Sequence, residues 1–415
     1  MKKKVLALLL ATAMIATFAG CSEKTEEPAG DVAVEGEEAG EEAITCTMTV
    51  WAPSEDQSTE NPWLQTQCEA FAAEHPNWDI TWEFAVCAEG DAKAMVTQDV
   101  TAAADVYCYA NDNVADLVAA DGIAELGGSV AEFVTSNFND VFVGSVTYNG
   151  SIYGIPYEPN TWIMYYNTSV LSEEDVKSLD TVLEKGTVMF PLTNSWYIEA
   201  FYTAVGAEFF GGNDNNDAGI NLGSDATKAT DYIVDLVANP NFKNGEFGDA
   251  VSGLKDGSVI AAFSGGWDRA NAEEALGDNY GAVAIPSINI DGTAYQMKNF
   301  AGSKAWAVNP STDNAQVATA LAVFLASESA QQARYDARGT VPALTSLKEK
   351  VASDPYVAVF NKQYADCSIS QPLCANMGNW WAPAGNMGNE LNAGDITHEN
   401  AAAKTEAFGN AINGN

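Results

Sequence analysis

Four of the ten tryptophans stand beside glycine, asparagine or serine near the expected ends of structural elements. Trp196 follows an Asn-Ser pair, Trp267 follows Gly-Gly, and Trp380 and Trp381 follow Gly-Asn. A single tryptophan is more often a core residue than a ligand contact, but an aromatic ring on an open loop needs a partner. The flat C–H face of a pyranose ring stacks on such rings, and sugar hydroxyls bond to Asp, Glu and Asn. The pattern is therefore suited to a neutral carbohydrate.

Composition argues against several other kinds of site. The 415 residues include 57 acidic and 19 basic ones, and the net charge of −38 disfavours nucleic acid and anionic lipid as partners. The only two histidines, His75 and His398, are far apart in the sequence, which disfavours a histidine-rich metal site or a histidine-activated nucleophile. No phosphate-binding loop or dinucleotide-binding turn occurs. The polar run at 213–217 departs from the EF-hand pattern at Ala218 and is expected to form a surface turn. No metal or cofactor is predicted.

The first part of the sequence resembles an export and anchoring signal. Three lysines precede an apolar run at 5–18, which is too short to span a membrane as a helix. Small residues then precede Cys21, as in the bacterial lipobox, where a peptidase cleaves before a cysteine that becomes lipid-modified. An ordinary secretory signal with an incidental cysteine is the alternative. We expect 1–20 to be a lipoprotein signal peptide.

The next segment, 21–43, is expected to be a disordered acidic tether. Residues 22–43 hold nine acidic residues and one lysine, without an aromatic residue, so they cannot bury enough surface to fold. An acidic interaction tail is the alternative. The six remaining cysteines could pair outside the cell, with Cys367 and Cys374 as the best-spaced local pair. However, Cys46, Cys87 and Cys108 occur in strand-like apolar runs, where cysteine is often a small buried residue.

The folded part alternates between strand and helix patterns. Strands are predicted at 44–51, 79–86 and 104–109, with helices at 61–74 and 92–103 between them, and a β-α-β-α-β order implies a parallel sheet. The polar triplet 111–113 is expected to cap a helix through 121. Ligands bind beyond the carboxyl ends of strands in such sheets, so the loops at 52–57 and 110–113 should lie at a site. Further along the chain, helices are predicted at 194–205, 225–238 and 315–327, and strands at 259–264, 282–285 and 305–308.

The chain resembles the family 1 extracellular solute-binding proteins of ABC importers, in particular the maltose/maltodextrin-binding lipoproteins of Gram-positive bacteria. The resemblance spans about residues 45–412. It rests on motifs that occur in the family's order after the lipobox: TVWAPSEDQ at 49–57, ADVY at 104–107, GIPY at 154–157, MYYN at 164–167, KDGSVIAAFSGGW at 255–267, FAG at 300–302 and AQQAR at 330–334.

The resemblance implies an α/β, two-lobe periplasmic-binding-protein-like fold of type II. Each lobe would be a mainly parallel sheet flanked by helices, with a sugar cleft between the lobes. Three chain crossings are expected, near 159–163, 302–306 and 351–357. The expected lobes are 44–158 plus 307–352 at the N-terminal side, and 159–306 plus 353–415 at the C-terminal side.

The resemblance also implies the ligand-binding residues. Trp196, Trp267 and Trp381 match the positions of aromatic residues that stack on glucosyl rings, and Trp380 adjoins the last of them. Tyr109 matches an aromatic position of the N-terminal lobe, and Asp112 matches a hydroxyl acceptor.

The remaining expected contacts are polar residues on neighbouring segments: Glu55, Asp56, Asn111, Glu158 and Asn160. Asn160 stands where the maltose-binding pattern has an acidic residue, and Asp56 and Asn113 stand where relatives carry basic ones. These departures leave the identity of the sugar open.

The expected function is that of a substrate-binding lipoprotein without a reaction of its own. It would be a monomer on the extracellular face of the cytoplasmic membrane, anchored through Cys21, and would deliver maltooligosaccharides to the transmembrane subunits of an ABC permease. A binder of xylo-, fructo- or galacto-oligosaccharides or of another small solute is one alternative. A secreted glycosidase is another, because acidic residues are too numerous for spacing alone to exclude a catalytic pair.

Overall fold

The computed structural model describes residues 42–60, 62–212 and 214–414. The expected signal peptide, Cys21 and the tether as far as residue 41 lie outside the described residues. Among the residues that are described, every helix is too short or too polar to cross a membrane.

The first sheet is built around the β-α-β-α-β unit that the sequence predicts. Strand β1 pairs in parallel with both β2 and β3, while β16 runs antiparallel to β3. Helix α1 begins after Pro62 and ends before Pro76, which fixes its length between the first two strands. The strand order and bounds are β17 (Ser368–Ser370), β16 (Asn299–Val308), β3 (Val106–Ala110), β1 (Ile44–Ala52) and β2 (Trp78–Val86), with β6 (Ile155–Asn160) also paired to β16.

In the second sheet four strands run in one direction and one, β7, runs in the other. Strand β8 is parallel to β11 and β12, and β7 is antiparallel to β12 and β13. Both sheets are therefore mixed. In the first sheet, the strands that precede the loops at 52–57 and 110–113, β1 and β3, are paired in parallel. The strand order and bounds are β11 (Phe242–Asn244), β8 (Val188–Phe190), β12 (Ala261–Gly265), β7 (Trp162–Asn167) and β13 (Tyr280–Val283).

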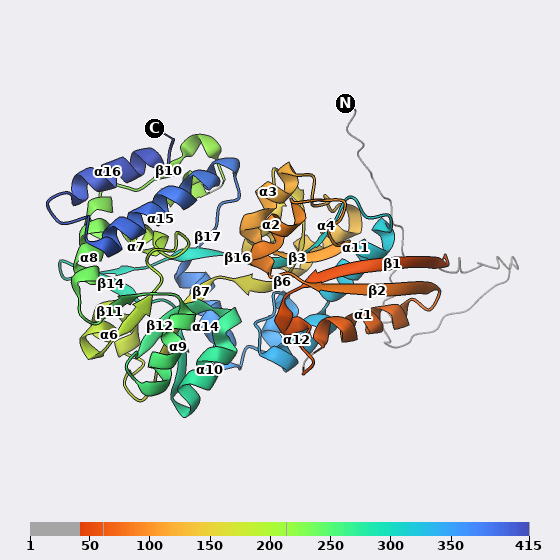
Figure 1. The fold of residues 1–415 in the computed structure, drawn as a ribbon, viewed down its shortest axis with the longest axis horizontal. Coiled ribbons are helices and arrows are strands. Elements are labelled where there is room, and N and C mark those ends of the chain that lie inside the picture. The colour runs from red at the N-terminus through yellow and green to blue at the C-terminus, as the bar shows by residue number, and fades with distance from the viewer. Residues whose placement is uncertain (1–41, 61, 213, 415) are drawn as a thin grey trace, which may run out of the picture.

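Each sheet has its own hydrophobic core, and helices cover both sheets (Figure 1). In β7, Trp162 and Met164 enter one core of the second sheet, while Ile163 and Tyr165 enter the other, because successive strand residues point to opposite faces. This explains why the run at 162–166 is apolar throughout rather than alternating.

The helices divide between these cores. Those with side chains in the core of the first sheet are α1 (Trp63–Glu74), α2 (Ala92–Val96), α3 (Val114–Ala119), α4 (Gly128–Asn137), α5 (Asp140–Ser145), α11 (Ala315–Leu325), α12 (Glu328–Arg338) and α13 (Thr345–Lys350). Those with side chains in the cores of the second sheet are α6 (Leu179–Lys185), α7 (Glu199–Ala204), α8 (Ala226–Ala238), α9 (Phe247–Asp256), α10 (Arg269–Leu276), α14 (Pro355–Asp366), α15 (Gly378–Ala393) and α16 (Ala401–Ala411). Short strands complete the fold: β4 (Thr147–Tyr148), β5 (Ser151–Ile152), β9 (Glu208–Phe209), β10 (Ile220–Asn221), β14 (Ser287–Ile290) and β15 (Thr293–Gln296).

The connection between the two sheets at β6 and β7 is short. Strand β6 belongs to the first sheet and β7 to the second, and only Thr161 separates them. Strand β16 spans the same boundary, because Phe300 packs in the second core and residues 305–308 pack in the first (Figure 1).

Two predicted helices are shorter than expected. The helix predicted at 92–103 ends at Val96, because Asp99 Oδ1 accepts hydrogen bonds from the backbone and side chain of Thr101 and favours a turn. The helix predicted at 194–205 begins only at Glu199, because Asn194 Oδ1 accepts a bond from the Trp196 N–H and holds a turn there.

The structure also tests two minor expectations. The six cysteines of the described part are buried and free, so the pairing of Cys367 with Cys374 is wrong; both pack as small residues in one hydrophobic cluster. Asn215 Oδ1 accepts a bond from the Asp217 N–H, as in an Asx turn, and within the described residues no group of side chains is arranged to bind a metal.

Candidate functional site

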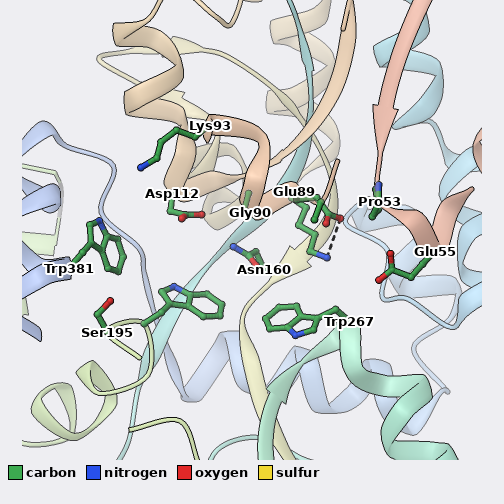
Figure 2. Close-up of a pocket in the computed structure, with 14 residues that line it drawn as sticks. Pro53, Glu55, Glu89, Gly90, Lys93, Asp112, Asn160, Ser195, Trp267 and Trp381 are labelled. Atoms are coloured by element: carbon green, nitrogen blue, oxygen red, sulfur yellow. Dashed lines mark ion pairs between the residues drawn. The ribbon is translucent and has the colours of Figure 1, made fainter. Parts of the chain in front are cut away.

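A cavity of about 670 Å³ lies between the ends of the two sheets (Figure 2). Tryptophans dominate one side, and carboxylate and amide side chains the other. It is lined by Pro53, Glu55, Ala88, Glu89, Gly90, Lys93, Ala110, Asp112, Asn160, Ser195, Trp196, Trp267, Lys304 and Trp381.

The polar side of the cavity, which we call the acceptor wall, comprises Glu55, Glu89, Asp112 and Asn160. The first three lie in short 3-10 turns just after β1, β2 and β3. Since these strands are parallel, their carboxyl ends meet at one edge of the sheet, which brings the three loops together as the topology predicts. The wall offers oxygen acceptors for hydroxyl donors.

The aromatic wall comprises Trp196, Trp267 and Trp381. They come from the turn before α7, the turn after β12 and the first part of α15. The ring centroids of Trp196 and Trp267 are 6.1 Å apart with 35° between their planes. Figure 2 shows Trp267 and Trp381 across the cavity from Asp112 and Gly90. The two walls together match a ligand with apolar faces and hydroxyl edges.

Asp112 is an acceptor whose pKa is shifted by its surroundings. Its side chain is open to the cavity, but protein surrounds it on the other sides, and this desolvation raises the pKa of Asp112 to about 6. The neighbouring cation Lys93 pairs instead with Asp116, at 2.8 Å. The predicted capping by 111–113 is wrong, because none of these side chains bonds to the first turn of α3; Asn113 accepts a bond from the Lys93 N–H.

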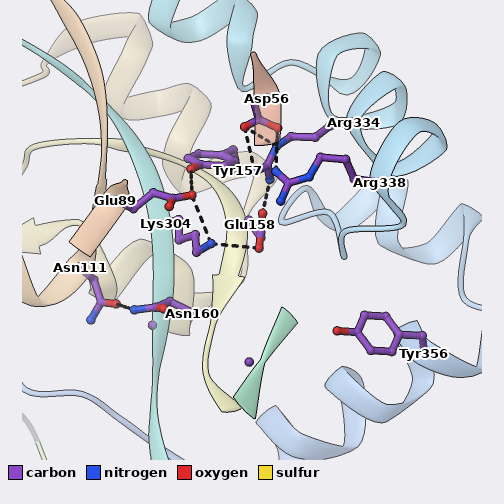
Figure 3. Close-up of polar contacts among 12 residues, drawn as sticks. Asp56, Glu89, Asn111, Tyr157, Glu158, Asn160, Lys304, Arg334, Arg338 and Tyr356 are labelled. Atoms are coloured by element: carbon purple, nitrogen blue, oxygen red, sulfur yellow. Dashed lines mark hydrogen bonds and ion pairs between the residues drawn. The ribbon is translucent and has the colours of Figure 1, made fainter. Parts of the chain in front are cut away.

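A buried ion network supports the acceptor wall (Figure 3). Lys304 lies 3.2 Å from Glu89 and 3.3 Å from Glu158, and Arg334 pairs with Glu158 and with Asp56. Burial alone would raise the pKa of Glu158, but Arg334, Lys304 and Arg338 outweigh it and lower this pKa to about 2. The network comprises Asp56, Glu89, Glu158, Lys304, Arg334 and Arg338, so its charges balance.

The structure brings six of the eleven predicted ligand contacts to the cavity wall and places the other five behind it. The six are Glu55, Asp112, Asn160, Trp196, Trp267 and Trp381. The five behind it are Asp56, Tyr109, Asn111, Glu158 and Trp380, all buried.

Four of these five have definite hydrogen-bond or ion-pair partners. Asn111 accepts a 2.9 Å bond from Asn160, Asp56 and Glu158 belong to the ion network, and Trp380 donates to the Ser195 carbonyl. Tyr109 packs in the core of the first sheet. Direct contact with a ligand is therefore not proposed for the five, which support the wall from behind.

Three charged residues at the cavity were not predicted: Glu89, Lys93 and Lys304. Glu89 and Lys93 could have been found, because the loop after the second parallel strand must share an edge with the loops after the first and third. Lys304 could also have been found, because it is the single charged residue within the largely apolar run at 300–308. Its ammonium lies 5.5 Å from the ring centroid of Trp267, so it contacts both walls.

A sequence profile of the bacterial extracellular solute-binding proteins matches residues 66–360. The chain belongs to this family. Among relatives of this solute-binding protein, the galactooligosaccharide-binding protein of Bacillus subtilis is 27% identical over 307 residues, covering 68% of this chain and 70% of the relative. The maltodextrin-binding protein MdxE of the same organism is 27% identical over 296 residues, covering 65% and 70%.

Solved structures share the fold of this solute-binding protein. A structure solved with acarbose is 46% identical, with a TM-score of 0.85, and covers 89% of this chain and 98% of that one. The maltodextrin-binding protein MalE1 from L. casei, solved without ligand, is 25% identical with a TM-score of 0.80 and covers 88% and 98%. The two-lobe α/β fold expected from the resemblance is thereby confirmed.

Proposed function

We propose that this solute-binding protein captures maltooligosaccharides in the cavity and delivers them to the transmembrane subunits of an ABC importer. The observation that carries this proposal is the cavity itself, in which three tryptophans face carboxylate and amide acceptors. A glucan presents C–H faces for the rings and hydroxyls for the acceptors. The names of MdxE and MalE1 support the same ligand class.

The mechanism is lobe closure without a chemical reaction. We propose the lobes as 44–158 plus 307–352 and 159–306 plus 353–415, joined at 159–163, 302–306 and 351–357. A ligand that contacts both walls stabilises the closed arrangement over the open one, and the permease would recognise that arrangement. The protein acts as a monomer anchored through Cys21 at the extracellular face of the membrane.

A galacto-oligosaccharide is the second candidate ligand, favoured by the name of the Bacillus subtilis relative. Calorimetric titration of the purified protein with maltotriose, maltotetraose, a β-galacto-oligosaccharide, xylotriose and a fructo-oligosaccharide separates these classes. We expect the maltooligosaccharides to bind most tightly. Tighter binding of the galacto-oligosaccharide would overturn the maltooligosaccharide proposal.

The proposal also requires that bound sugar is returned unchanged. Incubation of the protein with maltotriose, followed by chromatography, should recover maltotriose alone. Release of maltose and glucose in proportion to the protein would show a glycosidase instead.

A further inference from the structure

The Trp196 ring is tied to the rest of the protein by a single polar contact. Its backbone N–H is held by Asn194 at 3.0 Å, and its carbonyl accepts a 3.2 Å bond from the Trp162 indole. Both contacts fix the main chain, while the ring itself packs beside Tyr197 and Trp267, at centroid distances of 5.8 and 6.1 Å. The indole Nε1 donates to Gln371 Oε1 at 2.8 Å, and among the described residues this is the polar contact that the ring itself makes.

Gln371 is buried, with 4% of its surface exposed, and it is placed by the strand that joins the lobes. It directly follows β17, which pairs in parallel with residues 299–301 of β16. The Gln371 backbone N–H continues this pairing and donates to the Ala301 carbonyl at 2.9 Å. The side chain therefore extends from the crossing strand to the aromatic wall.

The amide of Gln371 has one polar partner in the described structure. An indole nitrogen can only donate, so the amide atom that faces it must be the oxygen. The Nε2 atom on the other side is buried without a hydrogen-bond partner. A half-satisfied buried amide costs free energy, and packing alone would be served equally well by an apolar side chain of the same length. The bond to Trp196 is the contact that distinguishes glutamine from such a side chain.

We propose that Gln371 is a positioning residue for sugar binding, which fixes the plane of the Trp196 ring at the cavity. The inference rests on the proposed function. A ring that is already oriented spares the ligand the entropic cost of ordering it, and stacking requires the ring plane to match the sugar face. Because Gln371 is bonded to β16, the orientation of this ring depends on the strand that crosses between the lobes.

The test compares Gln371→Met, which keeps the length of the side chain and removes the acceptor, with Gln371→Glu, which keeps an oxygen acceptor. By calorimetry with maltotriose, we expect Gln371→Met to weaken binding about 3- to 10-fold and Gln371→Glu to stay within about 3-fold of wild type, in line with one lost neutral hydrogen bond. Trp196→Phe removes the donor, so Gln371→Met should add nothing in that background. Trp381→Phe is the matched control, since no ring contact or hydrogen bond joins Trp381 to Trp196 or Gln371 in the described structure, and there the two effects should add.

A readout without sugar reports the ring directly. The indole N–H signal of Trp196 in a nitrogen–proton correlation spectrum is assigned by its loss in Trp196→Phe. The Trp267 signal is assigned in the same way with Trp267→Phe. In the wild-type protein the Trp196 proton should exchange with solvent more slowly than that of Trp267, and this comparison requires no variant of Gln371. In Gln371→Met the signal should move upfield and exchange faster.

The outcomes are distinguishable. If the wild type binds maltotriose, but Gln371→Met binds equally well or its effect adds to that of Trp196→Phe, the positioning role is overturned and the proposed function stands. Equal exchange of the two indole protons in the wild type would also overturn it. If the wild type binds none of the saccharides, the proposed function fails and the positioning role with it.

Discussion

Glu55 and Asp56 are neighbours in the chain, but their side chains lie in different environments. Glu55 is exposed at the cavity, and Asp56 is fully buried against Arg334 and Arg338. Replacing Asp56 with alanine removes the carboxylate that Arg334 and Arg338 share and leaves Arg334 with Glu158 alone, which should reduce the free energy of unfolding by ~3–5 kcal/mol. Urea denaturation measures this. Glu55→Ala is the control, and a change of stability above about 0.5 kcal/mol there would contradict the assignment of the two environments.

The aromatic wall should carry a large part of the binding free energy. Trp267→Ala or Trp381→Ala removes a stacking surface and its buried area, and should weaken maltotriose binding by ~2–4 kcal/mol, or roughly 30- to 1000-fold in Kd. Trp82→Ala on the outer strand β2 is the matched control, because this half-buried ring is remote from the cavity lining. Variants of Trp267 and Trp381 that fold and bind within a few-fold of wild type would show that these rings serve packing alone.

Asp112 should make sugar binding depend on pH. With its pKa raised to about 6, the side chain is a carboxylate at pH 7.5 and mostly protonated at pH 5. A carboxylate accepts hydroxyl bonds better than the acid form, so maltotriose affinity should fall as the pH decreases through about 6. In Asp112→Asn the binding free energy for maltotriose should be weaker by ~1.5–3 kcal/mol at pH 7.5, and the affinity should no longer change as the pH passes through about 6.

The contribution of Asp112 to the stability of the apo protein should change with pH in the direction opposite to its contribution to sugar affinity. The folded-state pKa of Asp112 lies above its unfolded value, so its contribution to stability is complete below the unfolded pKa and is lost as the pH rises through about 6. Asp112→Asn should therefore melt no lower than wild type at pH 7.5. A lower melting temperature with unchanged affinity would assign Asp112 a structural role instead of a ligand role.

Strand β16 shows how an element supports the cavity. A β-carbon at Gly302 would lie 2.3 Å from the side chain of Asn111, which holds Asn160 at the acceptor wall. Gly302→Ala should therefore lower the free energy of unfolding by ~1–3 kcal/mol and weaken maltotriose binding, as measured by denaturation and calorimetry. Gly144→Ala in helix α5 meets no atom within 4 Å and should instead stabilise the protein by ~0.5–1 kcal/mol. Equal effects of the two substitutions would contradict the close approach at Gly302.

The elements that the sequence predicts best are those defined by local pattern. Strands β1, β2 and β3 and helices α1, α8 and α11 appear within about two residues of expectation, because apolar periodicity and prolines set them. The predicted length of helix α2 is too great, because the turn at Asp99 depends on a side-chain hydrogen bond that competes with the helix. The three loop positions of the acceptor wall followed from topology alone.

The buried supports of the site could not be predicted from local pattern. Asp56 and Glu158 are separated in sequence from Arg334 by 278 and 176 positions, and only the folded chain reveals that they are paired. Trp380 and Trp381 are adjacent, and a sequence cannot tell which of two neighbouring helix residues faces the core. The structure buries Trp380 completely and leaves Trp381 at the cavity.

At the scale of the whole molecule, the proposed anchor at Cys21 sets where the protein works. Cys21→Ala should leave the chain uncleaved or release it into the medium, because a diacylated cysteine supplies the membrane affinity that a single acyl chain does not. Fractionation of cells with mass spectrometry of the first residues measures both. A Cys21→Ala protein that is processed and retained like wild type would show that another feature holds it.

The late position of β16 in the chain has a consequence for the order in which the two sheets can form. All five strands of the second sheet lie within residues 162–283, so that sheet can be completed as soon as this stretch of chain has been made. The first sheet starts earlier in the chain but lacks β16, which joins β3 to β6 and β17, until residues 299–308 are present. The sheet that begins first in the chain is therefore completed last, and its edge at β3 stays unpaired until β16 is present.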